Sequence, residues 1–260
     1  MTYFGILLAF IFPWLLLLLL VVPGDLWRWL RTRSGRVDWR AYLVVLVHVA
    51  LALVYTTPWD NYLVASGVWW YNPRLVTGLV LGYVPVEEYT FFVAQTLLTG
   101  LWTVWLLRRA RTPEPQSGVC MRIGASLALL AIWALAVIAL FSSWTAGRYL
   151  ALILSWALFP VWVQVTFGAD ILAARWRSLV PAICLPTLYL WGMDYLAIVG
   201  GTWVIDPRQT TGLRLGALPF EEMLFFLMTN LIIGCGVTLM LATESQARAR
   251  RWLAQWVLKV

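Results

Sequence analysis

The stretch Pro85–Val86–Glu87–Glu88–Tyr89–Thr90–Phe91–Phe92 recurs later in the chain as Pro219–Phe220–Glu221–Glu222–Met223–Leu224–Phe225–Phe226. Each copy opens a long apolar run, over residues 93–107 and 227–242. Adjacent carboxylates at the mouth of a membrane-length helix are costly to place and usually serve a function. Because the same costly pattern occurs twice, we expect its four glutamates to form one acid centre in a membrane protein.

The composition places the chain in a membrane. Of its 260 residues, 62% are hydrophobic and 12% are charged, which is more apolar and less charged than soluble domains. The first apolar run, at residues 4–22, has no basic leader or small-residue cleavage site, so it is predicted to be a retained span rather than a signal peptide. Cys120, Cys184 and Cys235 lie far apart in no metal-ligand spacing, and we expect them to be small packing residues.

Seven apolar stretches approach the length of about 20 residues that a membrane helix needs. They are residues 4–22, 41–57, 84–107, 123–141, 150–167, 179–199 and 218–242. The sequence therefore predicts an all-α integral membrane fold with seven transmembrane helices.

The basic residues predict the orientation of these spans. Most of the 19 lie in the connections after the first, third, fifth and seventh spans, whereas Arg74, Arg148, Arg208 and Arg214 lie on the other side. Positive charge favours the cytoplasmic side, so the N-terminus is predicted outside and the C-terminus inside the cell membrane. The net charge of +7 is then explained by orientation and contact with anionic lipid, and no nucleic-acid partner is expected.

The repeated motif belongs to a longer internal repeat. The shift that places Asp60 on Asp194 also aligns Trp69 with Trp203 and continues without a gap through the two Phe-Phe pairs. We interpret the chain as a duplicated three-helix unit, with residues 1–110 as the first unit and 146–260 as the second. The fourth helix, in a linker at 111–145, makes the two units parallel in the membrane.

The segments just before the two motifs, residues 58–83 and 200–217, are predicted to be long loops on the outer side. Loops of this length are usually functional. Their aromatic residues, Trp69 and Trp203 among them, fit either an interfacial aromatic belt or a lid over a lipid-facing pocket.

The motif sequence also predicts its geometry. Pro85 and Pro219 suit the first turn of a helix, which places both glutamate pairs at the positive end of a helix dipole. A less specific interpretation is that these acids simply lie at exposed helix N-termini and have no catalytic role. In each copy the two glutamates lie four residues before the two phenylalanines, so each acid shares a helix face with a ring.

Adjacent side chains on a helix point about 100° apart. A carboxyl pair must therefore form between the two units, with one glutamate from each. Burial in a dry site keeps a carboxyl group protonated, and aromatic faces stabilise cations. Together these groups suit chemistry in which an acid protonates an alkene.

Asp60 and Asp194 end the second and sixth predicted spans, and Arg74 and Arg208 follow a proline in the outer loops. We predict a structural Asp–Arg pair in each unit, with the alternative that these groups support the glutamates.

Other polar residues inside the spans are assigned packing roles. His48 is expected to be a hydrogen-bonded packing residue, and Gln95, Thr99 and Asn230 are expected to bond between helices. No dinucleotide fingerprint, P-loop, HExxH or paired-cysteine pattern occurs, so neither a metal nor a cofactor is expected.

The doubled Pro-x-Glu-Glu-x-x-Phe-Phe motif within a duplicated three-span unit resembles the membrane-integral lycopene cyclases of carotenoid biosynthesis, in the fused single-chain form. The resemblance implies a lycopene β-cyclase: a cofactor-free, redox-neutral cyclisation of the acyclic end groups of lycopene to β-ionone rings, giving γ- or β-carotene. Its implied catalytic residues are Glu87, Glu88, Glu221 and Glu222. The adjoining rings are then expected to bind substrate: Phe91, Phe92, Phe225, Phe226, Trp69 and Trp203.

Rival functions are distinguished by what they require. A retinal photoreceptor needs a lysine in its last span, but the only lysine is Lys259, near the chain end. An intramembrane polyprenyl transferase needs aspartate clusters that hold magnesium, whereas Asp60 and Asp194 are isolated. A carotenoid-binding scaffold does not explain two matched acid pairs. A C50 rather than C40 substrate, the oligomeric state and the identity of the acid and the base stay open.

Overall fold

The computed structural model describes residues 1–32, 37–110 and 118–257. Within them, seven helical segments are long and apolar enough to cross a membrane, which confirms the predicted all-α, seven-span fold. The chain is a multi-pass membrane protein. Four residues used in the sequence argument, Arg33, Arg36, Arg111 and Lys259, lie outside the described ranges.

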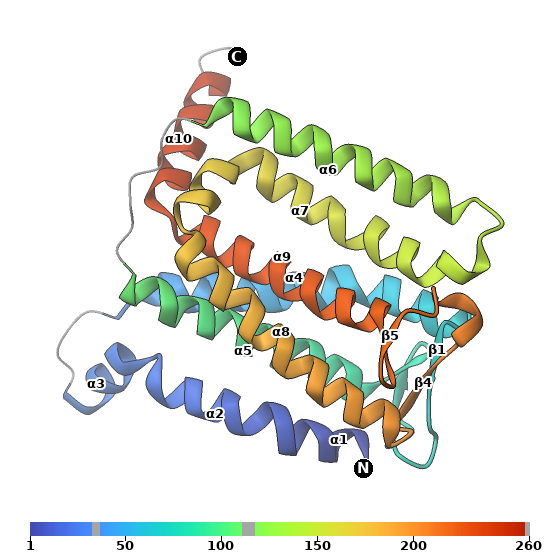
Figure 1. Cartoon of the computed structure of the whole chain (residues 1–260). Helices are drawn as coiled ribbons and strands as arrows, with labels where there is room; N and C mark the ends of the chain where they lie inside the picture. The colour runs from blue at the N-terminus through green and yellow to red at the C-terminus, as the bar shows by residue number, and fades with distance from the viewer. Residues whose placement is uncertain (33–36, 111–117, 258–260) are drawn as a thin grey trace.

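The first span is built from three pieces: α1 (Tyr3–Ile6), a π-helical turn η1 (Leu7–Ile11) and α2 (Phe12–Val21). The remaining spans are single helices with short 3₁₀ turns between some of them: α4 (Trp39–Ala65), α5 (Val86–Arg109), α6 (Val119–Leu140), η2 (Thr145–Gly147), α7 (Arg148–Ala174), α8 (Trp176–Val199) and α9 (Phe220–Leu241). Two further helices, which were not expected from the sequence, lie at the same end of the bundle but on opposite sides of it: α3 (Gly24–Thr32) and α10 (Thr243–Val257) (Figure 1).

Helix α4 is longer than the predicted second span, because it continues through Pro58 to Ala65. The prediction that a loop begins at residue 58 is therefore wrong. The polar residues that ended the apolar run are satisfied inside the protein: Asn61 Nδ2 donates to Thr57 O at 2.9 Å, and Asp60 is buried. A hydropathy pattern cannot distinguish such inward-facing polar groups from the end of a helix.

The loops that precede the two motif helices contain short strands, and one pair of these strands joins the two units. Strand β1 (Trp69–Tyr71) pairs antiparallel with β4 (Trp203–Ile205), with Trp70 opposite Val204 at the centre of the ladder. Each unit also has a hairpin before its motif helix: β2 (Val80–Leu81) with β3 (Val84–Pro85), and β5 (Arg214–Leu215) with β6 (Leu218–Pro219). A 3₁₀ turn, η3 (Pro207–Gln209), follows β4. The ladder relates the two copies by a local two-fold axis.

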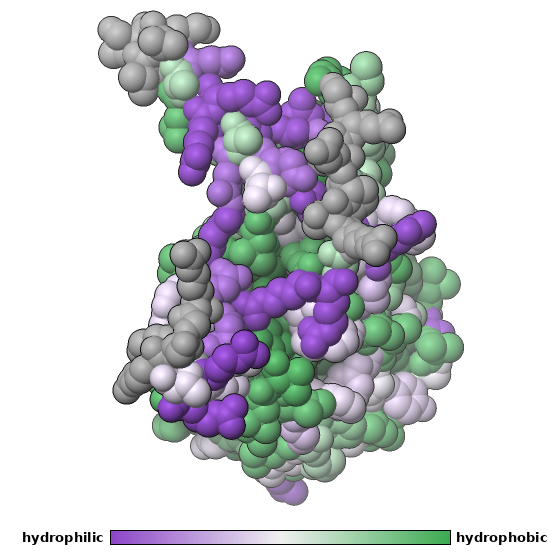
Figure 2. Space-filling model, turned by 90° about the vertical axis from the view of Figure 1, so that its left-hand side faces the viewer, coloured by the Kyte–Doolittle hydropathy of each residue, from purple (hydrophilic) through white to green (hydrophobic). Residues whose placement is uncertain are grey.

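The motif helices α5 and α9 lie side by side at the centre of the bundle and are its most buried spans. Helix α6 packs against α7 at the periphery and faces outward along most of its length. Hydrophilic residues gather at the end formed by α3 and α10, with apolar residues between and beside them, as Figure 2 shows. The boundaries of the two units at residues 110 and 146 stay a prediction.

Candidate active site

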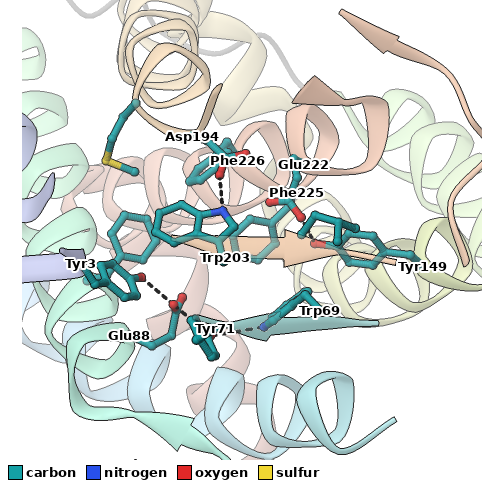
Figure 3. Close-up of a pocket in the computed structure, with 13 residues that line it drawn as sticks. Tyr3, Trp69, Tyr71, Glu88, Tyr149, Asp194, Trp203, Glu222, Phe225 and Phe226 are labelled. Carbon is teal, nitrogen blue, oxygen red and sulfur yellow. Dashed lines mark hydrogen bonds between the residues drawn. The ribbon is translucent and has the colours of Figure 1, made fainter. Parts of the chain in front are cut away.

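A small pocket lies at the end of the bundle opposite α3 and α10, between the two motif helices (Figure 3). Its volume is about 40 Å³, which is room for very few water molecules. Glu88 of α5 and Glu222 of α9 both line it, so one carboxyl group from each unit enters the same space. Both side chains are buried, although each helix begins only a few residues earlier, at the caps Pro85 and Pro219.

Glu88 is held by two phenols. The hydroxyl of Tyr3, at the start of the first span, donates to Oε2 of Glu88 at 2.5 Å, and the hydroxyl of Tyr71 donates to the same oxygen at 3.1 Å. Trp69 Nε1 in turn donates to the Tyr71 hydroxyl at 3.2 Å. Burial, with the nearby carboxylates of Asp60 and Glu88, raises the pKa of Tyr71 well above its ordinary value, so Tyr71 stays a donor at neutral pH.

Glu222 has a related but smaller set of partners. The hydroxyl of Tyr149, at the start of α7, donates to Oε1 of Glu222 at 2.6 Å. In the repeat alignment, Ile205 takes the position of Tyr71 and has no hydroxyl to donate. Among the described residues, Glu222 therefore receives one phenolic hydrogen bond where Glu88 receives two. The two half-sites are not equivalent.

The neighbouring glutamates point elsewhere. The backbone N–H of Thr77 donates to Glu87 Oε1 at 2.6 Å, and that of Thr211 donates to Glu221 Oε1 at the same distance. Both carboxyl groups are buried but bind the loop of their own unit, and they are not part of the pocket wall. The expected centre of four glutamates is thus divided by the helix rotation, with one residue of each pair facing the pocket.

The predicted Asp–Arg pairs are wrong. Asp194 lines the pocket and accepts a hydrogen bond from Trp203 Nε1 at 2.8 Å, and Asp60 is buried in α4. Arg208 instead pairs with Asp206 in its own turn, with Nε 3.1 Å from Oδ1, and its side chain is 88% exposed. Arg74 is also exposed. An arginine side chain on the protein surface keeps its water shell. Pairing with one of the buried aspartates would strip that water from the guanidinium group, which costs free energy.

The two aspartates also carry oxygens without partners. Oδ2 of Asp60 and Oδ2 of Asp194 are buried, and neither has a hydrogen-bond partner among the described residues. An ionised carboxylate without hydrogen-bond partners is costly to bury, so these two aspartates are expensive to place and mark the surroundings of the pocket.

Aromatic rings form the rest of the wall. Phe91 and Phe226 meet edge to face with ring centroids 6.1 Å apart, and Phe225 stacks on Trp156 at 6.1 Å. Trp69 and Trp203 are buried and line the pocket. Phe92 lies outside the acid pocket and lines the adjoining cavity instead.

The polar residues deeper in the spans connect helices, as predicted. Gln95 Nε2 donates to Thr229 Oγ1 at 2.9 Å, and Thr99 Oγ1 donates to Asn230 Oδ1 at 2.7 Å. His48 Nδ1 lies 2.7 Å from Val44 O, which fits a packing role.

The cysteine prediction holds only in part. Cys235 is buried, as a packing residue should be, but Cys120 and Cys184 are exposed on the outside of the bundle. Within the described ranges no group of three or more His, Cys, Asp or Glu side chains could hold a metal ion.

Comparison with known proteins identifies the family. The family model described as lycopene cyclase matches residues 1–106 and 123–240. The chain belongs to the lycopene cyclase family. It is 40% identical over 194 residues to a lycopene beta-cyclase of Halobacterium salinarum, covering 74% of this chain and 79% of that protein. It is also 34% identical over 204 residues to a bifunctional lycopene cyclase/phytoene synthase of Aspergillus niger, which covers 74% of this chain but 34% of the fungal protein. No solved structure matches the chain.

In this lycopene cyclase family member, sequence reasoning missed the three tyrosines that hold the acids. Tyr3 and Tyr149 each stand at the N-terminal end of the first span of a unit. The ungapped repeat did not reach them because the spacing between the first and second spans differs in the two units. A gapped alignment of the two units would have paired them. Tyr71 has no counterpart in the other unit and leaves no repeat signal.

Proposed function

We propose that this chain is a lycopene β-cyclase, which closes the acyclic end groups of lycopene into β-ionone rings, giving γ- and then β-carotene. The observation that supports this most directly is the pair of Glu88 and Glu222, one from each unit, in a single buried pocket with aromatic walls. The pocket supplies an acid, a base and cation-stabilising faces, and the family and its curated relatives carry the same activity.

The unequal hydrogen bonding suggests the division of roles. Hydrogen bonds donated to a carboxylate favour its ionised form, so the carboxyl group with two phenol donors, Glu88, is the base. Glu222 accepts a hydrogen bond from one phenol, so it carries the proton and is the acid. Two carboxyl groups in one dry pocket share a proton more readily than they ionise together.

The reaction balances without an oxidant or reductant. Glu222 transfers its proton to the terminal carbon–carbon double bond, which leaves a tertiary cation. A second double bond of the same chain attacks that cation, and the new carbon–carbon bond closes a six-membered ring. Glu88 then removes a ring proton to form the ring double bond. The proton returns from Glu88 to Glu222 before the next turnover, so the net change is an isomerisation.

Conservative substitutions test the assignment. Glu88→Gln and Glu222→Gln are expected to lower ring formation by about 100-fold or more, because each removes a proton-transfer group. Glu87→Gln and Glu221→Gln are the matched controls, because the amide oxygen can still accept the Thr77 or Thr211 N–H. Pigments from a lycopene-accumulating host carrying each variant would be separated by chromatography. Full activity of either Glu88→Gln or Glu222→Gln would refute the assignment of that residue.

We further propose that the protein lies in the cell membrane with its N-terminus outside and its C-terminus in the cytoplasm. The basic residues around α3 and α10 support this orientation, since positive charge gathers at that end. The acid pocket then lies near the outer face. Reporter fusions after the last residue should be active only in their cytoplasmic form, and the opposite pattern would reverse the orientation.

A further inference from the structure

A larger apolar cavity adjoins the acid pocket. It has a volume of about 370 Å³ and lies between α4, α5, α7 and α9, so both units contribute to it. Phe225 belongs to the walls of both spaces, with Trp156 stacked against it. The acid pocket and the larger cavity are thus neighbouring spaces that share the Phe225 ring as a wall.

A third cavity continues this space toward the other end of the bundle. Its volume is about 390 Å³, and it shares His48, Leu51, Val163 and Gln164 with the second cavity. It reaches Met240 and the first turns of α10. From Glu222 to Met240 the axis of α9 rises about 27 Å, compared with about 30 Å for the hydrocarbon core of a bilayer.

The space opens sideways toward lipid. Leu51 of α4 and Phe159 and Val163 of α7 line it, and all three are substantially exposed on the outside of the bundle. A hydrocarbon dissolved in the bilayer can therefore enter between α4 and α7 without crossing water.

The two units differ at a position beside this space. The repeat alignment places Trp102 on Gly236, and Trp102 Nε1 donates to Pro181 O at 3.1 Å between α5 and α8. At Gly236 even a Cβ atom would lie 2.3 Å from His48 Nε2. Gly236 thus lets the His48 ring pack against α9 beside the third cavity, whereas a tryptophan occupies the equivalent position in the other unit.

We propose that the second and third cavities together, here named the polyene groove, hold the linear chain of the substrate upright in the bilayer. This inference rests on the proposed function. One end group then lies in the acid pocket and the opposite end lies near α10. Because the acid pocket is small, the end group enters it only when the Phe225 ring moves aside.

An upright substrate has a consequence for the product. One binding event exposes one end group to the acids, so the bicyclic product requires release and a second binding in reverse. In the second event the ring already formed must fit at the inner end of the groove, near α10. The inner end therefore controls the ratio of bicyclic to monocyclic product, while the acid pocket controls whether any ring forms.

A substitution that narrows the inner end of the polyene groove tests this control of the product ratio. Ala249 lines the third cavity, and Ala249→Trp is expected to raise the ratio of monocyclic to bicyclic product at least tenfold with little change in lycopene consumption. Ala247 lies on the exposed face of the same helix, so Ala247→Trp is the control and should leave the ratio unchanged. An unchanged ratio in a normally inserted Ala249→Trp protein would overturn the proposal.

Narrowing the middle of the groove tests the binding of the chain itself. Ala52 lines the second cavity, so Ala52→Trp should raise KM for lycopene about tenfold or more, whereas Ala50→Trp, on the exposed face of α4, should not. The amount of full-length protein in the membrane is measured for each variant. For Ala249→Trp, near-normal consumption of lycopene shows that the protein is folded, so a changed product ratio cannot come from a folding defect.

These outcomes separate the two proposals. If the wild-type chain forms no rings from lycopene, the proposed function fails. If it forms rings, Glu88→Gln and Glu222→Gln abolish them, and the groove variants behave like their controls, the cyclase assignment stands and the polyene groove is refuted.

Discussion

At the residue scale, the site depends on where each phenol lies. Tyr3 and Tyr149 hold one glutamate each, and Tyr71 adds a second hydrogen bond on one side only. A hydrogen bond to a charged group contributes about 1.5–3 kcal/mol. One additional bond is therefore enough to place a shared proton mainly on the other glutamate.

Removing that bond should change the pH dependence of the reaction. In Tyr71→Phe the carboxylate of Glu88 is stabilised less, so activity on the acid side of the profile should be lost at a higher pH. Ring formation at neutral pH should fall about 10- to 100-fold, which corresponds to the loss of a charge-assisted hydrogen bond. The measurement is the pH profile of lycopene cyclisation in isolated membranes.

Tyr62→Phe is the control, because Tyr62 is exposed and its hydroxyl accepts a hydrogen bond from Arg148 at 3.1 Å. Its pH profile should match that of the wild type. A uniform loss in Tyr71→Phe, with no movement of the profile, would show that Tyr71 acts only through packing.

At the element scale, the start of each motif helix is fixed by its hairpin. The turns of β2–β3 and β5–β6 contain Gly82 and Gly216, both with positive φ. Below the hairpins, the carboxylates of Glu87 and Glu221 accept backbone N–H groups of the loops. Each hairpin thus sets the depth at which the pocket glutamate of its unit, Glu88 or Glu222, enters the bundle.

Two glycine substitutions should separate backbone strain from steric conflict. Gly78 and Gly82 both have positive φ, so alanine at either costs about 1–2 kcal/mol. At Gly82 the new Cβ would also lie 2.1 Å from Asn61 Oδ1, whereas at Gly78 nothing lies within 4 Å. Asn61 cannot move freely, because its Oδ1 accepts from the Tyr83 N–H at 2.7 Å.

Gly82→Ala is therefore expected to be less stable than Gly78→Ala by a further 1–3 kcal/mol or so. Thermal unfolding of the two purified variants in the same detergent measures the difference. Equal midpoints would mean that the hairpin relaxes around Asn61 at no cost.

At the scale of the whole molecule, neither unit contains a complete site. Tyr3 of the first unit packs against Trp203 of the second with ring centroids 4.9 Å apart, and β1 pairs with β4 across the boundary. The acids come one from each side, and the polyene groove is lined by both units. Activity should therefore require both units but not a continuous chain.

A divided chain tests this. Residues 1–110 and 118–260, produced together, should form rings, and either fragment alone should form none. A break in the middle of α6 is the control, because it leaves two apolar pieces too short to span a bilayer. Activity of one fragment alone, measured by pigment chromatography, would contradict a site shared between units.

The candidate site was predictable only to the level of the motif. The repeat showed that Glu88 and Glu222 occupy equivalent positions, and helix geometry required that any pair form between units. It could not show which glutamate of each pair faces inward, because that depends on how α5 and α9 are rotated against each other. The Asp–Arg prediction failed for a related reason, since proximity in sequence does not reveal that the aspartates face a dry interior.

The sequence by itself determined the membrane setting, the seven spans, the internal repeat and the helix-to-helix role of residues such as Asn230. These features follow from local composition, length and self-similarity. The tertiary structure alone decided which carboxyl groups meet, which tyrosines hold them and on which side of the bundle the groove opens. Those properties depend on contacts between residues far apart in the chain, such as Tyr3 with Glu88 and His48 with Gly236, and no periodic pattern encodes such contacts.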